Sequence, residues 1–327
     1  MKPKQQNQES LISLSGKQGY YLPHFLGLGS QRCASSWLYQ NLNLHPKIIM
    51  TSKKETRYFS HKITSASLEW YSNLFLKNLE QENSIIDDTF ILGEIDPSYA
   101  AMYYQEILQI KQIIPNLKII LIIRNPVERM ISSITRGWTF SYMESEEAKN
   151  TNIFYLLRSV DSSLPYRFTD YERTYKNWSS VFGEENIFID TYERIKFDPE
   201  GLLDDLLYFL QVNKNTQVIE NAINKKNVSK PEEKEDIPHL LRWYLSRKWL
   251  PKVRRLQSQL NLDLSSWIES MEKNASEGKW YYYLIILIHY IYFMIPYTFA
   301  YKLYNAIRIP LKIRQIQKNL HSQIGTS

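Results

Sequence analysis

An apolar run from Lys118 to Ile123, KIILII, constrains the fold of this 327-residue chain more than any other feature. Polar and apolar residues do not alternate in it, so we expect a strand that is buried on both faces. Such strands occur in parallel sheets that helices cover on both sides. Since 43% of the residues are hydrophobic, the chain can supply the large core that this arrangement needs.

Shorter apolar runs and helical patterns alternate on either side of this strand. Three further strands are expected, at His24–Leu28, Ile91–Gly93 and Ile187–Asp190. Apolar residues at i, i+3 and i+4 spacing predict helices at residues 35–44, 68–79, 99–113, 127–137, 171–182, 199–210 and 237–260. This order predicts an α/β fold with a mostly parallel central sheet between two helical layers.

The two ends of the chain differ from its middle. Residues 1–19 are polar and are expected to form a flexible lead, residues 20–272 the main domain, and residues 273–327 a tail. The net charge of +6 is concentrated in the tail, because residues 302–327 contain five basic side chains and no carboxylate. The rest of the chain is therefore nearly neutral, and we expect it not to bind nucleic acid. One Cys and six scattered His residues also predict no metal site.

The loop after the first expected strand, Gly27 to Leu38, has the composition of an anion-binding turn. Backbone N–H groups at the start of the next helix, the hydroxyls of Ser35 and Ser36, and the Arg32 guanidinium could converge on one phosphate. The loop lacks the Gly-Lys-Ser/Thr of a Walker motif, so ATP with magnesium fits poorly. An ordinary strand-to-helix turn with Ser as the N-cap is the alternative.

A second loop of this kind follows the central strand, from Arg124 to Ser132. Pro126 stands where a helix would begin, a position that tolerates its missing N–H. Arg124 is then at the strand tip and Ser132 two turns into the helix. Ligands of parallel sheets bind at the carboxyl ends of the strands, so one ligand could reach both side chains. The alternatives are a capping Asn125 and a surface ion pair of Glu128 with Arg129 or another neighbour, and both are common.

Together the two loops resemble the PAPS-dependent sulfotransferases, whose donor is 3′-phosphoadenosine 5′-phosphosulfate (PAPS). Residues 29–36 look like the family's 5′-phosphosulfate loop, and Arg124 and Ser132 look like the pair that holds the 3′-phosphate. Lys53–Phe59 and Gly93–Tyr99 are similar to two segments of the carbohydrate-directed, heparan-sulfate-sulfotransferase-like branch. Four motifs in the family's order, over roughly residues 22–270, make a chance resemblance improbable.

The resemblance implies a P-loop-like three-layer fold and a function for several residues. Glu55 would be the base that deprotonates the acceptor hydroxyl, and Arg32 would act on the 5′-phosphate and the leaving oxygen. Arg57 and Asp96 would contact the acceptor, and PAP would be the product. The donor would bind to residues of both loops: Gly29, Ser30, Gln31, Arg32, Cys33, Ala34, Ser35, Ser36, Trp37, Arg124 and Ser132.

Three departures from the family's pattern bear on this site. Arg32 stands where many members have Lys, and its larger fork need not occupy the same place. Ala34 replaces a Gly, so the backbone there must avoid positive φ or accept strain. Ile95 replaces a Lys, and Arg57 could supply the missing charge. Residues of the charge-rich segment 224–236 could cover the 3′-phosphate: Lys225, Lys226, Asn227 and Lys230.

The tail contains 22 residues, Trp280–Tyr301, without Asp, Glu, Lys or Arg. As a helix it would be about 33 Å long, enough to cross a bilayer. Seven of the 22 are Tyr, which prefers the membrane interface, and Pro296 interrupts the run. We therefore expect an interfacial, Pro-kinked anchor rather than a span, with residues 280–318 on the anionic inner face of a membrane. The alternative is a soluble terminal helix pair that packs on the domain or on a second subunit.

The sequence thus predicts a cytoplasmic, membrane-associated sulfotransferase that moves a sulfuryl group from PAPS to a hydroxyl of a sugar or glycolipid, without a metal. Two alternatives remain open. One is a non-catalytic, membrane-associated nucleotide-binding module, which Ala34 and Ile95 suggest. The other is a different phosphate-handling transferase with a P-loop-like fold.

Overall fold

The computed structural model describes residues 20–80, 90–135, 152–215, 220, 237–260 and 262–324. A five-stranded sheet with the order β2-β3-β1-β4-β5 lies at its centre, and every pair of neighbouring strands is parallel. This confirms the predicted α/β class. The strands are β1 (Phe25–Gly27), β2 (Ile48–Met50), β3 (Ile91–Ile95), β4 (Lys118–Ile123) and β5 (Ile187–Thr191).

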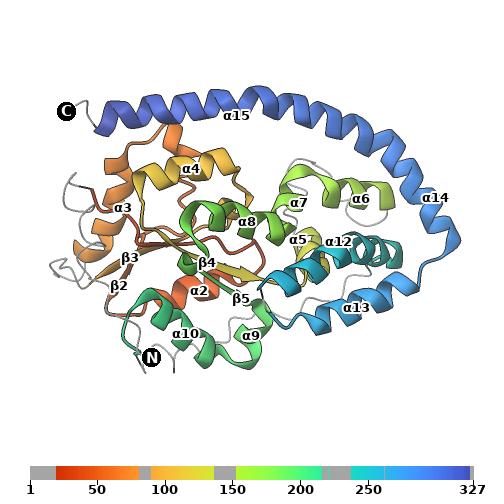
Figure 1. The fold of residues 1–327 in the computed structure, drawn as a ribbon, viewed down its shortest axis with the longest axis horizontal. Coiled ribbons are helices and arrows are strands. Elements are labelled where there is room, and N and C mark those ends of the chain that lie inside the picture. The colour runs from red at the N-terminus through yellow and green to blue at the C-terminus, as the bar shows by residue number, and fades with distance from the viewer. Residues whose placement is uncertain are drawn as a thin grey trace.

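Helices cover both faces of the sheet (Figure 1). Before the tail they are α2 (Ser35–Leu42), α3 (Leu68–Glu80), α4 (Tyr104–Ile113), α5 (Pro126–Thr135), α6 (Ile153–Asp161), α7 (Ser163–Thr169), α8 (Tyr171–Phe182), α9 (Tyr192–Phe197), α10 (Pro199–Leu210), α12 (His239–Leu260) and α13 (Ser265–Ser276). Short 3₁₀ turns are η1 (Lys62–Thr64), η2 (Pro97–Ala101) and η4 (Glu184–Asn186).

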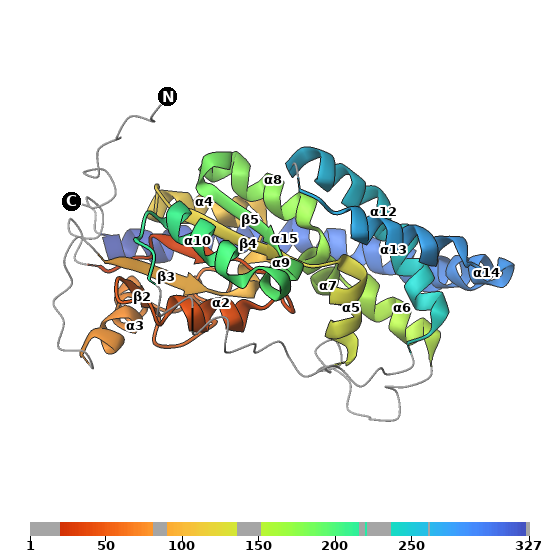
Figure 2. The same ribbon diagram turned by 90° about the horizontal axis from the view of Figure 1, so that it is seen from below.

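The central strand β4 explains why two helical layers are needed. Ile119, Leu121 and Ile123 point into one core cluster, which includes side chains of α3, α4 and α8. Ile120 and Ile122 point into a second cluster with side chains of α2, α9 and α10. In Figure 2, α4 and α8 lie above the sheet and α2 lies below it. The uninterrupted apolar run is therefore buried on both faces, as the sequence predicts.

Two glycines allow the middle strands to pack closely. A Cβ atom at Gly27 would lie 2.1 Å from the Ile95 side chain, and one at Gly93 would lie 1.9 Å from the Phe25 ring. Each glycine thus makes room for a bulky residue of the neighbouring strand. This packing determines how β1 and β3 lie side by side, and both strands lead into the candidate site.

The sequence predicted most elements, with three clear differences. Strand β2, which is three residues long, was missed. The helix expected from residue 99 begins at Tyr104, because Pro97 and the capping Asp96 start a separate 3₁₀ turn before it. Helices α6, α7, α9 and α13 were not among the expected helices. The predicted lead at residues 1–19 and residues 225, 226, 227 and 230 of the charge-rich segment lie outside the described residues.

The tail forms α14 (Trp280–His289), a π-helical turn η5 (Tyr290–Met294) and α15 (Ile295–Ile324). Figure 1 shows it as one curved band that runs over α4 toward α3. Helix Trp280–Gln323 is long and apolar enough to cross a membrane by length and composition alone. The helix does not break at Pro296, because the π turn just before it absorbs the irregularity that Pro introduces.

Candidate active site

The predicted chemistry-bearing loops lie at one edge of the sheet. The segments that follow β1, β2 and β4 all leave from the carboxyl ends of parallel strands. Strand β1 lies between β3 and β4, since Gly27 is in register with Ile95 on one side and with Ile120 on the other. Ligands of open parallel sheets bind at this edge.

Arg32 and Arg124, which are 92 residues apart in the sequence, lie next to each other. The Arg124 Nη1 donates to the carbonyl oxygen of Arg32 at 3.2 Å, and the Arg32 Nε donates to Ser132 Oγ at 3.2 Å. Tyr171 donates its hydroxyl to the Arg124 carbonyl oxygen at 2.9 Å. The structure thus joins three predicted donor-binding residues into one cluster.

Helix α2 begins without a side-chain cap. Its N-cap is Ala34, which has φ 61° and ψ 28° and no oxygen to accept from the first turn. The first intrahelical bond is donated by Leu38 to the Ala34 carbonyl, so the N–H groups before it have no partner within the helix. The alternative of a turn capped by Ser is therefore wrong. Ala34 therefore has the positive φ that a Gly at this position would adopt without strain.

The other predicted donor-binding side chains differ in their exposure. Ser30 is buried and donates to the Phe168 carbonyl at 2.6 Å, and Trp37 is part of the core. The Cys33 thiol is buried, and burial raises its pKa to about 11, so it stays neutral. Ser35 is buried and Ser36 exposed at the start of α2. Any contact of Ser30, Cys33 or Trp37 with a donor would therefore use the backbone.

Arg129 was not assigned a function from the sequence, yet the structure places it under the donor loop. Its side chain is fully buried. Nη1 donates to the Gln31 carbonyl at 3.5 Å and Nη2 to the Pro165 carbonyl at 3.2 Å. Arg129 thus ties the loop after β1 to α7. The only sign of Arg129 in the sequence was its place in the second motif, and that place did not predict that its side chain is buried.

The segment after β2 carries Glu55, the predicted base. Glu55 and Arg57 have φ values of 58° and 55° on either side of Thr56. The Thr56 hydroxyl and N–H both donate to Glu94 Oε1, at 2.5 and 3.2 Å. The Glu55 carboxylate accepts from Lys54 at 2.6 Å and its side chain is 37% exposed. The loop is thus pinned through Thr56, while Glu55 remains accessible to an acceptor.

Two buried carboxyl groups at the end of β3 hold this loop. Glu94 is fully buried and accepts from the hydroxyls of Tyr71 and Tyr99 as well as from Thr56. Burial raises the pKa of Glu94 to about 7. Asp96 accepts from the Arg57 N–H at 2.6 Å, and burial raises the pKa of its carboxyl too. Both groups position the loop.

The residues next to them bear on the expected acceptor contacts. Asp96 also caps η2, and its side chain is buried, so its predicted contact with the acceptor stays a prediction. Ile95, which replaces the family's Lys, is fully buried against Gly27 and belongs to the core. Within the described ranges, no group of three or more His, Cys, Asp or Glu could hold a metal ion.

Comparisons with known proteins agree with this geometry. The membrane-associated sulfotransferase kil1 of Dictyostelium discoideum is 32% identical over 111 residues, which are 34% of this chain and 22% of that protein. The chain therefore matches about a fifth of that relative's length. The crystal structure of a sulfotransferase from Alicyclobacillus acidocaldarius has the same fold, with a TM-score of 0.55, 22% identity, and coverage of 76% of this chain and 99% of that one.

The sulfotransferase domain model matches residues 22–238, which is about two thirds of the chain. This range includes β1–β5, the two donor loops and the Glu55 segment, and it ends before α12. The family predicted from the motifs is thereby confirmed: the chain belongs to the sulfotransferase domain family.

Proposed function

We propose that the protein transfers a sulfuryl group from PAPS to a hydroxyl group, with the donor across the ends of β1 and β4. The observation that carries this proposal is the cluster of Arg32, Arg124 and Ser132, which comes from two separate strand ends. A nucleotide with phosphate groups on both its 3′ and 5′ positions needs two anion sites about one nucleoside apart. Two neighbouring strand ends, each with an arginine, meet that need.

The residues present fit this donor. The uncapped first turn of α2 and Arg32 would hold the 5′-phosphosulfate, since helix N-termini and guanidinium groups both bind phosphate. Arg124 and Ser132 would hold the 3′-phosphate. Gln31 Oε1 is buried beside the loop without a protein partner, so a donor group of the bound nucleotide could satisfy it. Members of this family use PAPS as donor, which is why we propose PAPS over ATP.

Glu55 is the proposed base. Its carboxylate would take the proton of the acceptor hydroxyl while the acceptor oxygen attacks sulfur in line with the leaving oxygen. The sulfur–oxygen bond to the 5′-phosphate breaks, and its electron pair stays on PAP. Arg32 would stabilise the charge that develops on this leaving oxygen. The Glu55 carboxylate accepts from Lys54 at 2.6 Å, and its 37% exposure leaves it open to the acceptor.

The proposed acceptor is a sugar or glycolipid hydroxyl, and the proposed location is the cytoplasmic face of a membrane. The tail supports membrane association, because α14, η5 and α15 expose a stripe of large apolar side chains: Leu284, Leu287, Ile291, Ile295, Phe299, Leu303, Ile307 and Leu311. The relative from Dictyostelium discoideum is described as membrane-associated, in agreement with this proposal.

A transfer assay with isotope-labelled PAPS tests the function. The purified full chain should move label from PAPS into hydroxyl compounds of a membrane-containing cell extract. Glu55→Gln should lower this rate about 10²–10⁴-fold, because a positioned general base contributes that much. Its affinity for PAP should stay unchanged, because Glu55 is not in the donor cluster. Glu269→Gln, a change at an exposed residue of α13, is the matched control and should keep the rate.

Two outcomes would count against the proposal. Firm binding of PAP without any label transfer would favour the non-catalytic nucleotide-binding module. Full activity of Glu55→Gln would remove Glu55 as the base while leaving sulfuryl transfer in place.

A further inference from the structure

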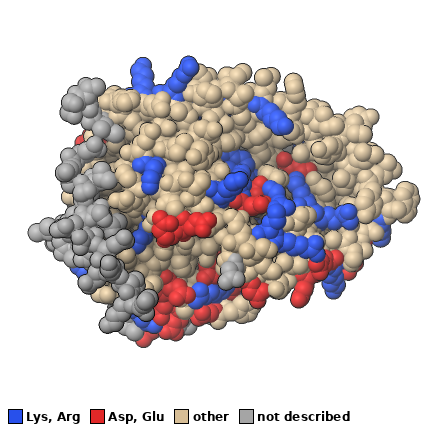
Figure 3. Space-filling model, in the orientation of Figure 1, with Lys and Arg blue, Asp and Glu red and all other residues tan. Residues whose placement is uncertain are grey.

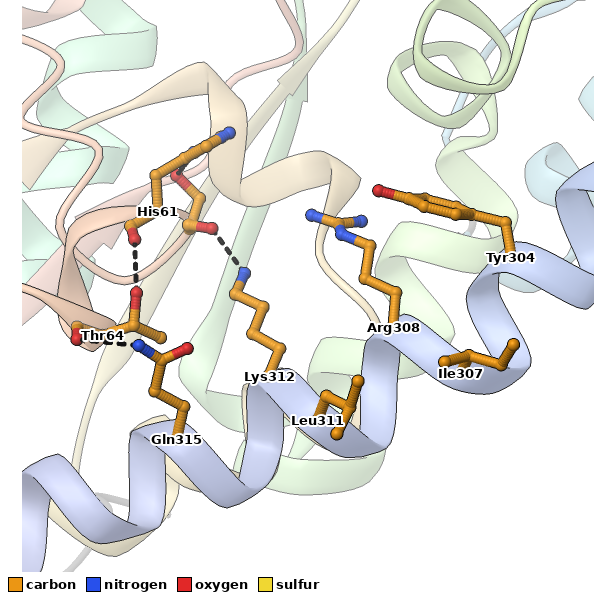
Figure 4. A pocket seen from close by; sticks show the side chains of 9 residues that line it. His61, Thr64, Tyr304, Ile307, Arg308, Leu311, Lys312 and Gln315 are labelled. Carbon is orange, nitrogen blue, oxygen red and sulfur yellow. Dashed lines mark hydrogen bonds between the residues drawn. The ribbon is translucent and has the colours of Figure 1, made fainter.

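An open pocket of about 490 Å³ lies between α15 and the loop that carries Glu55 (Figure 4). One wall is formed by Ser60, His61 and Thr64, which follow the Glu55 segment in the chain. The opposite wall is α15, from which Arg308 and Lys312 extend toward the His61 side (Figure 4). The pocket is thus built half from the catalytic domain and half from the tail, beyond the end of the family match at residue 238.

The pocket is electropositive. Lys312 is partly compensated, because it donates to Glu106 Oε1 and to the Ser60 carbonyl, both at 2.5 Å. Arg308 is half-buried, stacks on Tyr304, and has no ion pair with any carboxylate of the described residues. The pKa of His61 is lowered by burial and by nearby Lys312, Arg57 and Arg308, which reports the same positive potential. An anionic group would therefore be stabilised beside Arg308.

The rim of the pocket on α15 is apolar and exposed. Ile307 and Leu311, one turn apart, are 60% and 57% exposed, and Tyr304 is 59% exposed. They continue the apolar stripe that runs along α14 and α15. Over α15 the upper rim of the molecule shows basic and uncharged residues and no acidic ones (Figure 3). A ligand that combines an anionic head with an apolar tail matches this surface, and a bilayer offers many such molecules.

The pocket is also close to the proposed base along the chain. The N–H groups of His61 and Lys62 both donate to the Arg57 carbonyl, at 2.9 and 3.0 Å. Arg57 in turn lies two residues after Glu55 in the strained segment pinned to β3. One hydrogen-bonded turn therefore separates the pocket wall from the loop that carries the base.

We propose that this pocket binds the anionic headgroup of a membrane lipid, and that the acceptor is a hydroxyl-bearing lipid of this class that stays in the bilayer. Arg308 contacts the anionic group, the stripe on α15 lies among the acyl chains, and the headgroup hydroxyl reaches Glu55 from the membrane surface. The acceptor part rests on the proposed sulfuryl transfer, whereas the headgroup site does not.

Vesicle binding tests the headgroup site. The full chain is sedimented with vesicles of phosphatidylcholine, with and without phosphatidylinositol, whose head carries a phosphate and free hydroxyls. Arg308→Gln should weaken the phosphatidylinositol-dependent binding about tenfold or more, since a charge-assisted contact contributes roughly 1.5–3 kcal/mol. Arg314→Gln removes the same charge from an exposed position of the same helix and should change binding less than about twofold.

Equal losses for the two variants would mean that the membrane attracts the tail through its overall charge, and the site would be overturned. Binding of soluble inositol phosphate as tight as that of the lipid would also overturn it, because the apolar rim would then contribute nothing. Affinity for PAP is measured on the same samples and should be equal in all three proteins.

The acceptor class is tested by extraction of labelled product. With labelled PAPS and a membrane fraction, the label should enter the solvent-extractable lipids. Arg308→Gln should raise the KM for the membrane fraction about tenfold, with kcat nearly unchanged. Label found only in water-soluble products would contradict a lipid acceptor. Absence of label from every fraction would instead refute the proposed function, and the vesicle result would still stand.

Discussion

Four residues of the candidate loops have backbone conformations that L-residues rarely adopt. Arg32, Ala34, Glu55 and Arg57 have φ values of 72°, 61°, 58° and 55°. Two of them, Arg32 and Glu55, are the proposed catalytic residues. Each such conformation costs about 1–2 kcal/mol, which the surrounding contacts must offset. The hydrogen bond from Arg124 to the Arg32 carbonyl and the one from Thr56 to Glu94 supply part of that compensation.

Ala34→Gly tests whether this strain is real. Because Gly adopts positive φ without a steric penalty, the change should raise the free energy of unfolding by about 1 kcal/mol. Ala306→Gly, at an exposed position inside α15, should lower it by about 1 kcal/mol. Urea unfolding of both variants measures the two shifts. A loss of stability in Ala34→Gly would show that the left-handed conformation is not the native one.

Glu94 gives the stability of the fold a predicted pH dependence. Its pKa rises from 4.5 to about 7 on folding, so the native state keeps the proton longer than the unfolded chain does. Stability is therefore highest below pH 4.5 for this group and falls as pH rises through about 7, by at most about 3 kcal/mol. Glu94→Gln should flatten this decline when urea unfolding is compared at about pH 5 and about pH 8. An unchanged decline would assign it to other groups.

For individual residues, the sequence predicted that the proposed donor-binding side chains lie together, but not the residues that hold them in place. Arg32, Arg124 and Ser132 could be placed together because parallel strands end at one edge of a sheet. Arg129 could not be placed, because its burial depends on carbonyl groups of Gln31 and Pro165, which only the tertiary fold brings near. The sequence also could not predict that the hydroxyls of Thr56, Tyr71 and Tyr99 donate to Glu94.

The tail helix has two faces with different partners. On the inner face, the Tyr103 and Tyr301 hydroxyls lie 2.5 Å apart, and Asn319 donates to the Ile63 carbonyl at 2.7 Å. Buried Ile316 and Leu320 join the main core. The outer face carries the exposed stripe. This docking is what the alternative of a terminal helix pair packed on the domain predicted. The interfacial membrane contact stays a proposal, and the exposed stripe is what supports it.

Changing the stripe should weaken membrane binding without unfolding the protein. The double variant Leu287→Asn and Ile291→Asn replaces two side chains that are 54% and 50% exposed. Vesicle affinity should fall at least about tenfold, because burying each side chain in lipid gains on the order of 1 kcal/mol or more. The midpoint of thermal unfolding should stay nearly constant.

The matched control lies outside the tail. Phe197 and Tyr208 are 84% and 82% exposed on α9 and α10, and changing both to Asn should leave vesicle affinity unchanged. A similar loss in both double variants would point to general surface hydrophobicity rather than to the stripe.

Among the helices and strands, those with a long and regular apolar pattern were predicted correctly from the sequence. Strand β4 and helices α8 and α10 matched their predicted bounds, because each shows a long, regular pattern. Strand β2 is too short to show any periodicity. The docking of α15 on α4 could not be derived, because the polar contacts that fix it join residues about 200 positions apart.

At the scale of the whole molecule, the parallel sheet collects distant segments at one edge. The loops after β1 and β4 bring together Arg32, Arg124 and Ser132, the proposed donor-binding residues. The segment after β2 carries the proposed base, and α15 closes the adjacent pocket. This layout sets the proposed positions of the two substrates. The nucleotide binds at the strand ends, and the acceptor approaches from the side of the tail.

The most direct test of this account compares the binding of PAP and AMP by calorimetry. Arg124→Ala should weaken binding of PAP about 10–100-fold, because a charge-assisted contact to the 3′-phosphate contributes roughly 1.5–3 kcal/mol. Binding of AMP, which lacks the 3′-phosphate, should change by less than about twofold. An equal loss for both nucleotides would contradict the placement of one donor across the two strand ends.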